Sequence, residues 1–317
     1  MNRGRRTSCE LGRSSPDGCG SFQSEKFTVR SSLFAVNTRR REPQIHCELR
    51  TANWKLQAGY WGLAGAVYPL LLLSWALMST GAATNRALEI MREVERRQLT
   101  DSQSNIGAIE VVDGKGKVLN KSWQFWREGN RGQSKVLIRF VTPPEVRGVG
   151  FLTLNHPGAP AEQWLYTPAI QRDRRVAPQE KSQRFMGTDL THEDIEERSI
   201  EDYDYDLVGE EAFAGQPAYK IKAVYKHPGN TQYSQLYLWI RKDIVATAYI
   251  EFYIAAKLRK TMRWDDWKQI QGIWTPHLME VKDLARGSLT RIRSSDVKYS
   301  VRFEPDWFSL RNLRRVS

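Results

Sequence analysis

The sequence predicts a mainly β protein with a few helices, in which a curved antiparallel sheet forms a half-open barrel closed by a helical lid. Two observations lead to this prediction. About a dozen segments after residue 104 alternate apolar and polar residues as strands do, and turns such as Asp113-Gly114 and Gly129-Asn130 separate them. That many strands in hairpin order exceed what a flat open sheet usually holds, so the sheet is expected to curl.

Residues 1–54 form a predicted disordered extension, because they are rich in Arg, Ser and Gly and have few periodic apolar positions. We interpret this extension as an over-extended gene model. It contains all three cysteines, Cys9, Cys19 and Cys47, which have no metal-ligand spacing with histidines and are an odd number for a disulfide framework. The cysteine-free remainder suits an oxidising compartment.

Residues 55–83 have the features of a signal peptide. Lys55 provides a positive start, an apolar run extends over 61–78, and Gly81 and Ala83 occupy the small-residue positions before a cleavage site. Cleavage after Ala83 predicts an exported, periplasmic protein that begins near Thr84. No cysteine comes directly after that site, so the protein is not expected to be a lipoprotein itself. The alternative is a retained helix that anchors the protein to the inner membrane through residues 61–80.

The mature domain, residues 84–317, is expected to begin with an amphipathic helix over 84–99, capped by Thr84 or Asn85. Its apolar stripe needs a surface to cover, and the remainder of the domain is almost entirely strand, so the helix should pack on a sheet. The stripe consists of Ala87, Ile90, Met91, Val94 and Gln98.

The predicted strands are 105–112, 116–127, 135–141, 148–155, 163–166, 203–207, 217–225, 233–241, 246–254, 258–269, 275–284 and 289–300. In the segment 219–226 one face is apolar and the other mostly charged, as in a sheet with one wet side. Further along, Trp239 and Phe252 belong to segments that are apolar on both faces. Helices that cover one face explain this pattern, as does a ligand held in the concavity.

The stretch 162–197 is expected to contain a strand, a basic loop and a lid. The strand ends at Pro168, and the loop carries Arg172, Arg174 and Arg175. The lid then places an apolar group over a cavity mouth. Gly187 permits a positive φ there, and a short helix with acidic residues in its first turn comes next. The apolar lid residues are Phe185, Met186 and Leu190, and the candidate caps are Thr188, Asp189 and Thr191. The alternative is a surface loop with apolar anchors.

This stretch resembles the signature of the LolA-like outer-membrane lipoprotein-sorting protein family, and the similarity covers roughly residues 84–315. The matching residues are Trp164, Leu165, Tyr166, Pro168, Arg174, Arg175, Phe185, Met186, Gly187, Asp189, Glu193 and Asp194. Arg184, Leu190 and His192 depart from the family pattern. The resemblance implies a lipid-carrier fold, and it indicates the fold better than the ligand. The candidate residues for cargo binding and the lid are Trp164, Tyr166, Phe185, Met186, Gly187, Asp189, Leu190, Trp239 and Phe252.

No catalytic or metal site is predicted. The histidines, His46, His156, His192, His227 and His277, do not fall in a metal-binding spacing. The acids Glu193 and Asp194 beside His192 are interpreted as capping charges on an exposed helix start, and a hydrolase that uses them is the weakest alternative. No nucleotide-binding fingerprint or nucleophile motif occurs. We therefore expect a protein that is not an enzyme and has no cofactor.

The net charge of +12 does not indicate nucleic acid, because half of it comes from residues 1–83 and the rest is scattered along the strands. Two functions remain. The first is a monomeric periplasmic carrier that binds the acyl chains of a lipoprotein or another hydrophobic cargo and moves it towards the outer membrane, between an inner-membrane transporter and an outer-membrane acceptor. The second is a non-catalytic structural or adaptor domain of an envelope transport complex.

Overall fold

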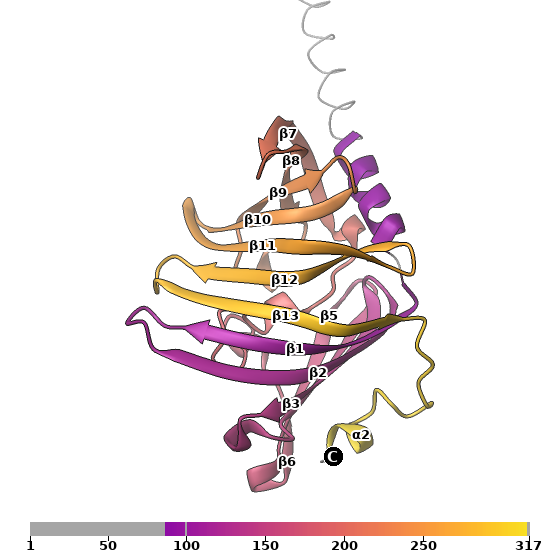
Figure 1. Cartoon of the computed structure of the whole chain (residues 1–317), viewed down its shortest axis with the longest axis vertical. Coiled ribbons are helices and arrows are strands. Elements are labelled where there is room, and N and C mark those ends of the chain that lie inside the picture. Colours follow the sequence, from indigo (N-terminus) through magenta and orange to yellow (C-terminus); the bar gives the residue numbers. More distant parts are fainter. Residues whose placement is uncertain (1–85, 99, 316–317) are drawn as a thin grey trace, which may run out of the picture. The chain divides into compact units, whose positions relative to one another are not determined.

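The computed structural model describes residues 86–98 and 100–315. The predicted extension (1–54), the predicted signal peptide (55–83) and the predicted caps Thr84 and Asn85 lie outside the described residues. The described part contains one antiparallel sheet in the order β6-β5-β4-β3-β2-β1-β13-β12-β11-β10-β9-β8-β7 (Figure 1). Its strands are β1 (Ser102–Val112), β2 (Val118–Asn130), β3 (Gln133–Thr142), β4 (Gly150–His156), β5 (Ala159–Thr167), β6 (Arg172–Arg175), β7 (Tyr203–Phe213), β8 (Gln216–Tyr225), β9 (Gln235–Arg241), β10 (Ala246–Ile254), β11 (Lys257–Ile270), β12 (Ile273–Asp283) and β13 (Ser288–Tyr299).

Two series of hairpins make up the sheet. Strands adjacent in sequence pair with each other within β1–β6 and within β7–β13, and the pairing of β1 with β13 joins the two series. Figure 1 shows β1, β2 and β9–β13 stacked across the front while β5 passes behind them, so the sheet is strongly curved. It does not close, because β6 and β7 are its two edges. The predicted mainly β, half-open antiparallel barrel is confirmed.

The segment predicted as a basic loop is partly a strand. Arg172–Arg175 form β6, which pairs with the end of β5 and places Arg175 opposite Trp164. An edge strand is paired on one side and keeps its side chains in water, so it needs no apolar alternation. The prediction was wrong here because the pairing partner, and not the local sequence, makes these residues extended.

The N-terminal helix, described over residues 86–98, packs on the sheet as its apolar stripe predicted. Ala87, Met91 and Val94 are buried against side chains of β7, β8 and β9. Burial of a side chain the size of methionine or valine contributes roughly 1.5–3 kcal/mol, which exceeds what an exposed ion pair such as Arg92–Glu201 adds. Among the described residues, no helix combines the length and the apolarity that crossing a membrane requires.

Successive residues of a strand point to opposite faces of the sheet, so each strand contributes to an inner and an outer face. The inner face carries a large apolar cluster that includes Trp123, Ile138 and Phe151. The outer face of β3–β5 carries a smaller cluster that includes Leu137, Leu152 and Tyr166.

The C-terminal segment covers this outer-face cluster. Leu313 of α2 (Leu310–Leu313) is fully buried within it, and Trp307 packs edge-on to Trp126 with ring centroids 5.5 Å apart. Arg139 of β3 donates a hydrogen bond of 2.6 Å to the carbonyl oxygen of Asn312. Both faces of β3–β5 are therefore dry, and the C-terminal segment covers the outer one.

Candidate functional site

A cavity of about 560 Å³ lies between the inner face of the sheet, helix 86–98 and the segment 190–203. Its apolar wall comes from β2, β3 and β9–β13 and consists of Trp123, Phe125, Val136, Ile138, Leu236, Leu238, Ile250, Phe252, Met262, Trp264, Met279 and Ile292. The helix adds Met91 and Val94. Its polar wall consists of Glu95, Gln98, Arg127, Arg131, Glu193, Asp194, Glu196, Glu197 and Arg198. The site therefore has an apolar interior and a charged side.

Residues 185–198, which we call the strap, run across the inner face. The strap begins with a tight reversal in which the N–H of Phe185 donates to the carbonyl oxygen of Leu190 at 2.7 Å. Met186 and Gly187 both have positive φ, at 49° and 76°, which such a reversal requires and glycine adopts at little cost. The Phe185 ring is fully buried, with its centroid 4.7 Å from that of Phe151. These residues close part of the sheet interior.

Asp189 fixes the strap to β13. Its buried carboxylate accepts hydrogen bonds from the hydroxyls of Ser288 at 2.5 Å and Thr290 at 2.8 Å, and its own N–H donates to Thr290 Oγ1 at 2.9 Å. Arg184 lies 3.0 Å from the same carboxylate. Burial of a carboxylate is unfavourable unless hydrogen-bond donors or a positive charge contact its oxygens. These partners therefore stabilise Asp189 in its buried position.

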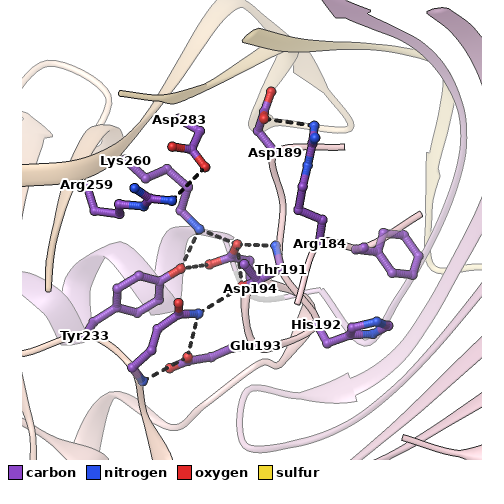
Figure 2. A network of polar contacts seen from close by, with 12 residues as sticks. Arg184, Asp189, Thr191, His192, Glu193, Asp194, Tyr233, Arg259, Lys260 and Asp283 are labelled. Carbon is purple, nitrogen blue, oxygen red and sulfur yellow. Dashed lines mark hydrogen bonds and ion pairs between the residues drawn. The ribbon is translucent and has the colours of Figure 1, made fainter. Parts of the chain in front are cut away.

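Asp194 fixes the strap to β11 and to the segment just before β9, as Figure 2 shows. Its carboxylate accepts from the N–H and the hydroxyl of Thr191, at 2.6 and 2.9 Å, and from Tyr233 Oη at 2.9 Å. The ammonium group of Lys260 contacts both Asp194 and the Tyr233 hydroxyl. Burial, reinforced by the charge of Asp194, raises the pKa of Tyr233, so this hydroxyl remains a donor.

The strap acids are buried, which corrects the prediction of an exposed helix start. The helix is a single turn, η4 (Glu193–Ile195), and no side chain caps it at His192. Glu193 and His192 are 5% and 7% exposed, and the Asp194 side chain is 2% exposed. The charges serve as partners of buried donors: Glu193 lies 3.0 Å from Arg198 and accepts from Gln232 Nε2 at 3.1 Å.

Glu197 fixes the far end of the strap to β2. Arg127 donates to the Glu197 carboxylate at 2.7 Å and to the carbonyl oxygen of Thr100 at 3.0 Å. One guanidinium therefore links the strap to Thr100, which follows helix 86–98 in the chain. Burial disfavours the ionised form of Glu197, but the charge and hydrogen bonds of Arg127 outweigh it and lower the pKa of Glu197. The nearby charge of Arg131 acts in the same direction.

The predicted cargo and lid residues fall into three groups. Leu190 and Phe252 line the cavity. Phe185, Met186, Gly187 and Asp189 form the strap reversal beside it, where the carbonyl oxygen of Met186 accepts from Lys121. Trp164, Tyr166 and Trp239 point to the outer face: the first two lie under the C-terminal segment, and the Trp239 indole donates to Glu211 at 2.6 Å.

Sequence reasoning missed most of the cavity wall. Met262 and Trp264 of β11, Met279 of β12 and Ile292 of β13 line the cavity, and each occupies one face of an alternating strand. That alternation could have found them as a set. It could not assign them to the inner face, because alternation defines two faces of a strand and does not say which one encloses a cavity. Within residues 86–98 and 100–315, no cluster of three or more His, Cys, Asp or Glu side chains suits a metal ion.

The fold and the cavity define a class of protein in which an open, curved antiparallel sheet encloses an apolar space beneath a helix. A family model described as "Uncharacterized protein" matches residues 132–315, more than half of the chain. The chain is similar to a DUF1329 family protein from Desulfovibrio piger, with 27% identity and a TM-score of 0.70 over 73% of this chain and 99% of that one. The chain belongs to this family, which is LolA-like.

Two further solved structures have the same fold. A Vibrio parahaemolyticus domain described as an outer membrane lipoprotein-sorting protein shares 25% identity at a TM-score of 0.69, over 73% of this chain and all of that one. A LolA superfamily protein from Nitrosomonas europaea, at 22% identity and a TM-score of 0.59, covers 71% of this chain and 98% of its own. A comparison with curated proteins gave no match.

Proposed function

We propose that this protein is a periplasmic carrier that holds the acyl chain of a lipoprotein or another hydrophobic cargo in the cavity and moves it towards the outer membrane. The observation that carries the proposal is the cavity of about 560 Å³ with an apolar wall beneath helix 86–98. The similarity to a domain described as an outer membrane lipoprotein-sorting protein supports it. The partners are then an inner-membrane transporter that loads the carrier and an outer-membrane acceptor that unloads it, and the carrier acts as a monomer.

The energetics of burial are sufficient for a carrier. Transfer of an acyl chain out of water is worth about 0.8 kcal/mol per CH₂, so a chain of about sixteen carbons gains roughly 12 kcal/mol before the cost of ordering it. A cargo with this gain stays bound through purification.

The arrangement of charges supports binding and not catalysis. A general base needs a free lone pair directed at its substrate. The carboxylates of Glu193, Asp194 and Glu197 line the cavity, but each accepts hydrogen bonds from donors of the protein itself. The adaptor alternative needs a filled sheet interior, and the cavity favours the carrier.

The test is a cavity-filling substitution with a matched control. Met279 of β12 lines the cavity, whereas its neighbour Leu278 points to the other face of the same strand and is absent from the lining. We expect Met279→Trp to lower the affinity for a fluorescent fatty-acyl probe at least tenfold, and Leu278→Trp to leave it unchanged. The wild type should also yield lipid to mass spectrometry. A wild type that carries no lipid and binds no probe saturably rejects the carrier and favours the adaptor.

A further inference from the structure

We infer that one end of the sheet docks on the surface of a bilayer that contains anionic phospholipids. This end, which we call the rim, consists of the turns and strand ends within residues 112–119, 141–149, 167–172, 254–259 and 282–289. No rim residue lines the cavity described above, so the inference does not rest on the proposed carrier function.

The pairing of the strands brings these turns together. Val112 ends β1 and lies opposite both Val118 of β2 and Leu289 of β13. From there the antiparallel pairing continues to the β3–β4 and β5–β6 turns on one side, and to the β12–β13 and β10–β11 turns on the other. Figure 1 shows the β1–β2 and β12–β13 turns side by side at the left of the view. Turns that are far apart in the sequence therefore share one end of the sheet.

Large apolar side chains are exposed at the rim. Seven large apolar residues are exposed in the described part of the chain, and five of them lie here, with exposed fractions between 37% and 68%. These five are Val118, Leu119, Val141, Ile170 and Leu284. Single exposed apolar residues are common on protein surfaces, but their concentration at one end of a molecule indicates an interaction site.

The rim also carries most of the net positive charge of residues 84–317. It contains eight Lys or Arg and three Asp or Glu, a balance of +5, whereas residues 84–317 as a whole have a balance of +6. Along the sequence these charges are scattered, and the strand pairing gathers them. The remainder of this part of the chain is therefore close to neutral.

Six of the rim cations are exposed and available to an anionic partner. Within residues 86–98 and 100–315, none of the six takes part in an ion pair of 4.0 Å or less. They are Lys115, Lys117, Arg147, Arg172, Lys257 and Lys282. Of the three rim acids, Asp283 pairs with Arg259 and Arg286. The carboxylate of Asp113 accepts from backbone N–H groups of its own turn, which leaves Glu145 as the third acid.

A bilayer fits this surface better than a folded protein does. Each Lys or Arg near an anionic membrane surface raises the affinity about fivefold, and apolar side chains between the cations enter the boundary between headgroups and acyl chains. A protein interface needs a continuous, well-packed centre, whereas the exposed apolar residues of the rim stand on four separate turns. A fluid surface accommodates such separate contacts without a complementary shape.

Flotation of the purified protein with lipid vesicles tests the charge of the rim. Vesicles of phosphatidylcholine are compared with an equal mixture of phosphatidylcholine and phosphatidylglycerol, and we expect tighter binding to the mixture that weakens as salt is added. Lys117→Glu combined with Lys282→Glu should lower the affinity for the mixture at least about twentyfold. The matched control, Lys298→Glu with Arg302→Glu, changes the net charge equally at the other end of β13. It should lower the affinity less than about threefold, because distant exposed charges are screened.

A fluorescent reporter on the rim tests the apolar contacts, whatever other segments of the chain contribute to binding. In a chain whose Cys9, Cys19 and Cys47 are replaced by serine, Leu284→Cys is labelled with an environment-sensitive fluorophore. The control is the same label on Gln216→Cys, an exposed position in the β7–β8 turn at the opposite end of the strands. With the mixed vesicles we expect a blue shift and brighter emission at position 284 and no change at position 216.

Three results would overturn the inference: no shift at position 284, equal binding by the wild type and both charge-reversal pairs, or an equal loss in both pairs. Each of them favours a protein partner for the rim. The fatty-acyl probe is titrated into the same variants and should bind them as it binds the wild type. A failure of membrane docking is therefore distinguished from a failure of the carrier function.

Discussion

Replacement of Lys260 by Met removes the charge partner of Asp194 and retains the apolar stem of the side chain. The Lys260 side chain is 4% exposed and that of Asp194 is 2%, so the variant leaves a buried carboxylate without a counter-charge. Removing one member of a buried ion pair costs about 3–5 kcal/mol. Asp194 keeps its hydrogen bonds from Thr191 and Tyr233, which stabilise the charge in part. We therefore expect a loss of about 3 kcal/mol, at the lower end of that range.

The assay is urea unfolding near neutral pH, monitored by tryptophan fluorescence and circular dichroism. A double variant is the control: Lys260→Met with Asp194→Asn removes both charges and keeps the hydrogen-bond acceptor, so it should recover all but about 1 kcal/mol. A loss below about 1 kcal/mol for Lys260→Met, the size typical of an exposed pair, would mean that the pair is solvated. A double variant no more stable than the single one would refute the role assigned to the uncompensated charge.

Local contacts lead to three further predictions. Burial lowers the pKa of His192 below 6.5, so the unfolded chain binds the proton more tightly and the free energy of unfolding should fall as the pH drops below about 6.5. His192→Phe should abolish this pH dependence, and an unchanged slope of the free energy of unfolding against pH contradicts the assignment to His192. Gly107→Ala should cost about 1–3 kcal/mol in chemical unfolding, because a Cβ there would lie 2.0 Å from Trp123 Nε1; a neutral variant would show that the ring moves freely. In hydrogen exchange, the strap (185–198) should be at least as protected as helix 86–98 in the empty protein, which is the reverse of the order expected for a mobile lid. Faster exchange in the strap than in the helix would show that the strap is a mobile lid.

The sequence by itself determined the strands and the helix, because each leaves a short-range periodic pattern of apolar residues along the chain. Each predicted strand corresponds to one of β1–β5 or β7–β13, and Met91 and Val94 of the predicted stripe are buried on the sheet. The family signature at 164–194 led to the LolA-like fold.

The tertiary structure decided which face of each strand is the inner one. Trp164 and Tyr166 are aromatic residues in a strand beside the strap, yet the C-terminal segment covers them on the outer face. Trp264, equally aromatic, lines the cavity. Alternation with a period of two defines two faces but does not distinguish them when both are apolar, because the covering segment comes from a distant part of the chain.

The tertiary structure also decided the state of the strap acids. Asp194 and Glu193 look like surface charges in the sequence, since acidic residues at a helix start are usually solvated. Their partners Lys260 and Gln232 lie 66 and 39 residues further along the chain. Only folding brings these donors to the carboxylates, and only with them present does the burial of two charges become stable.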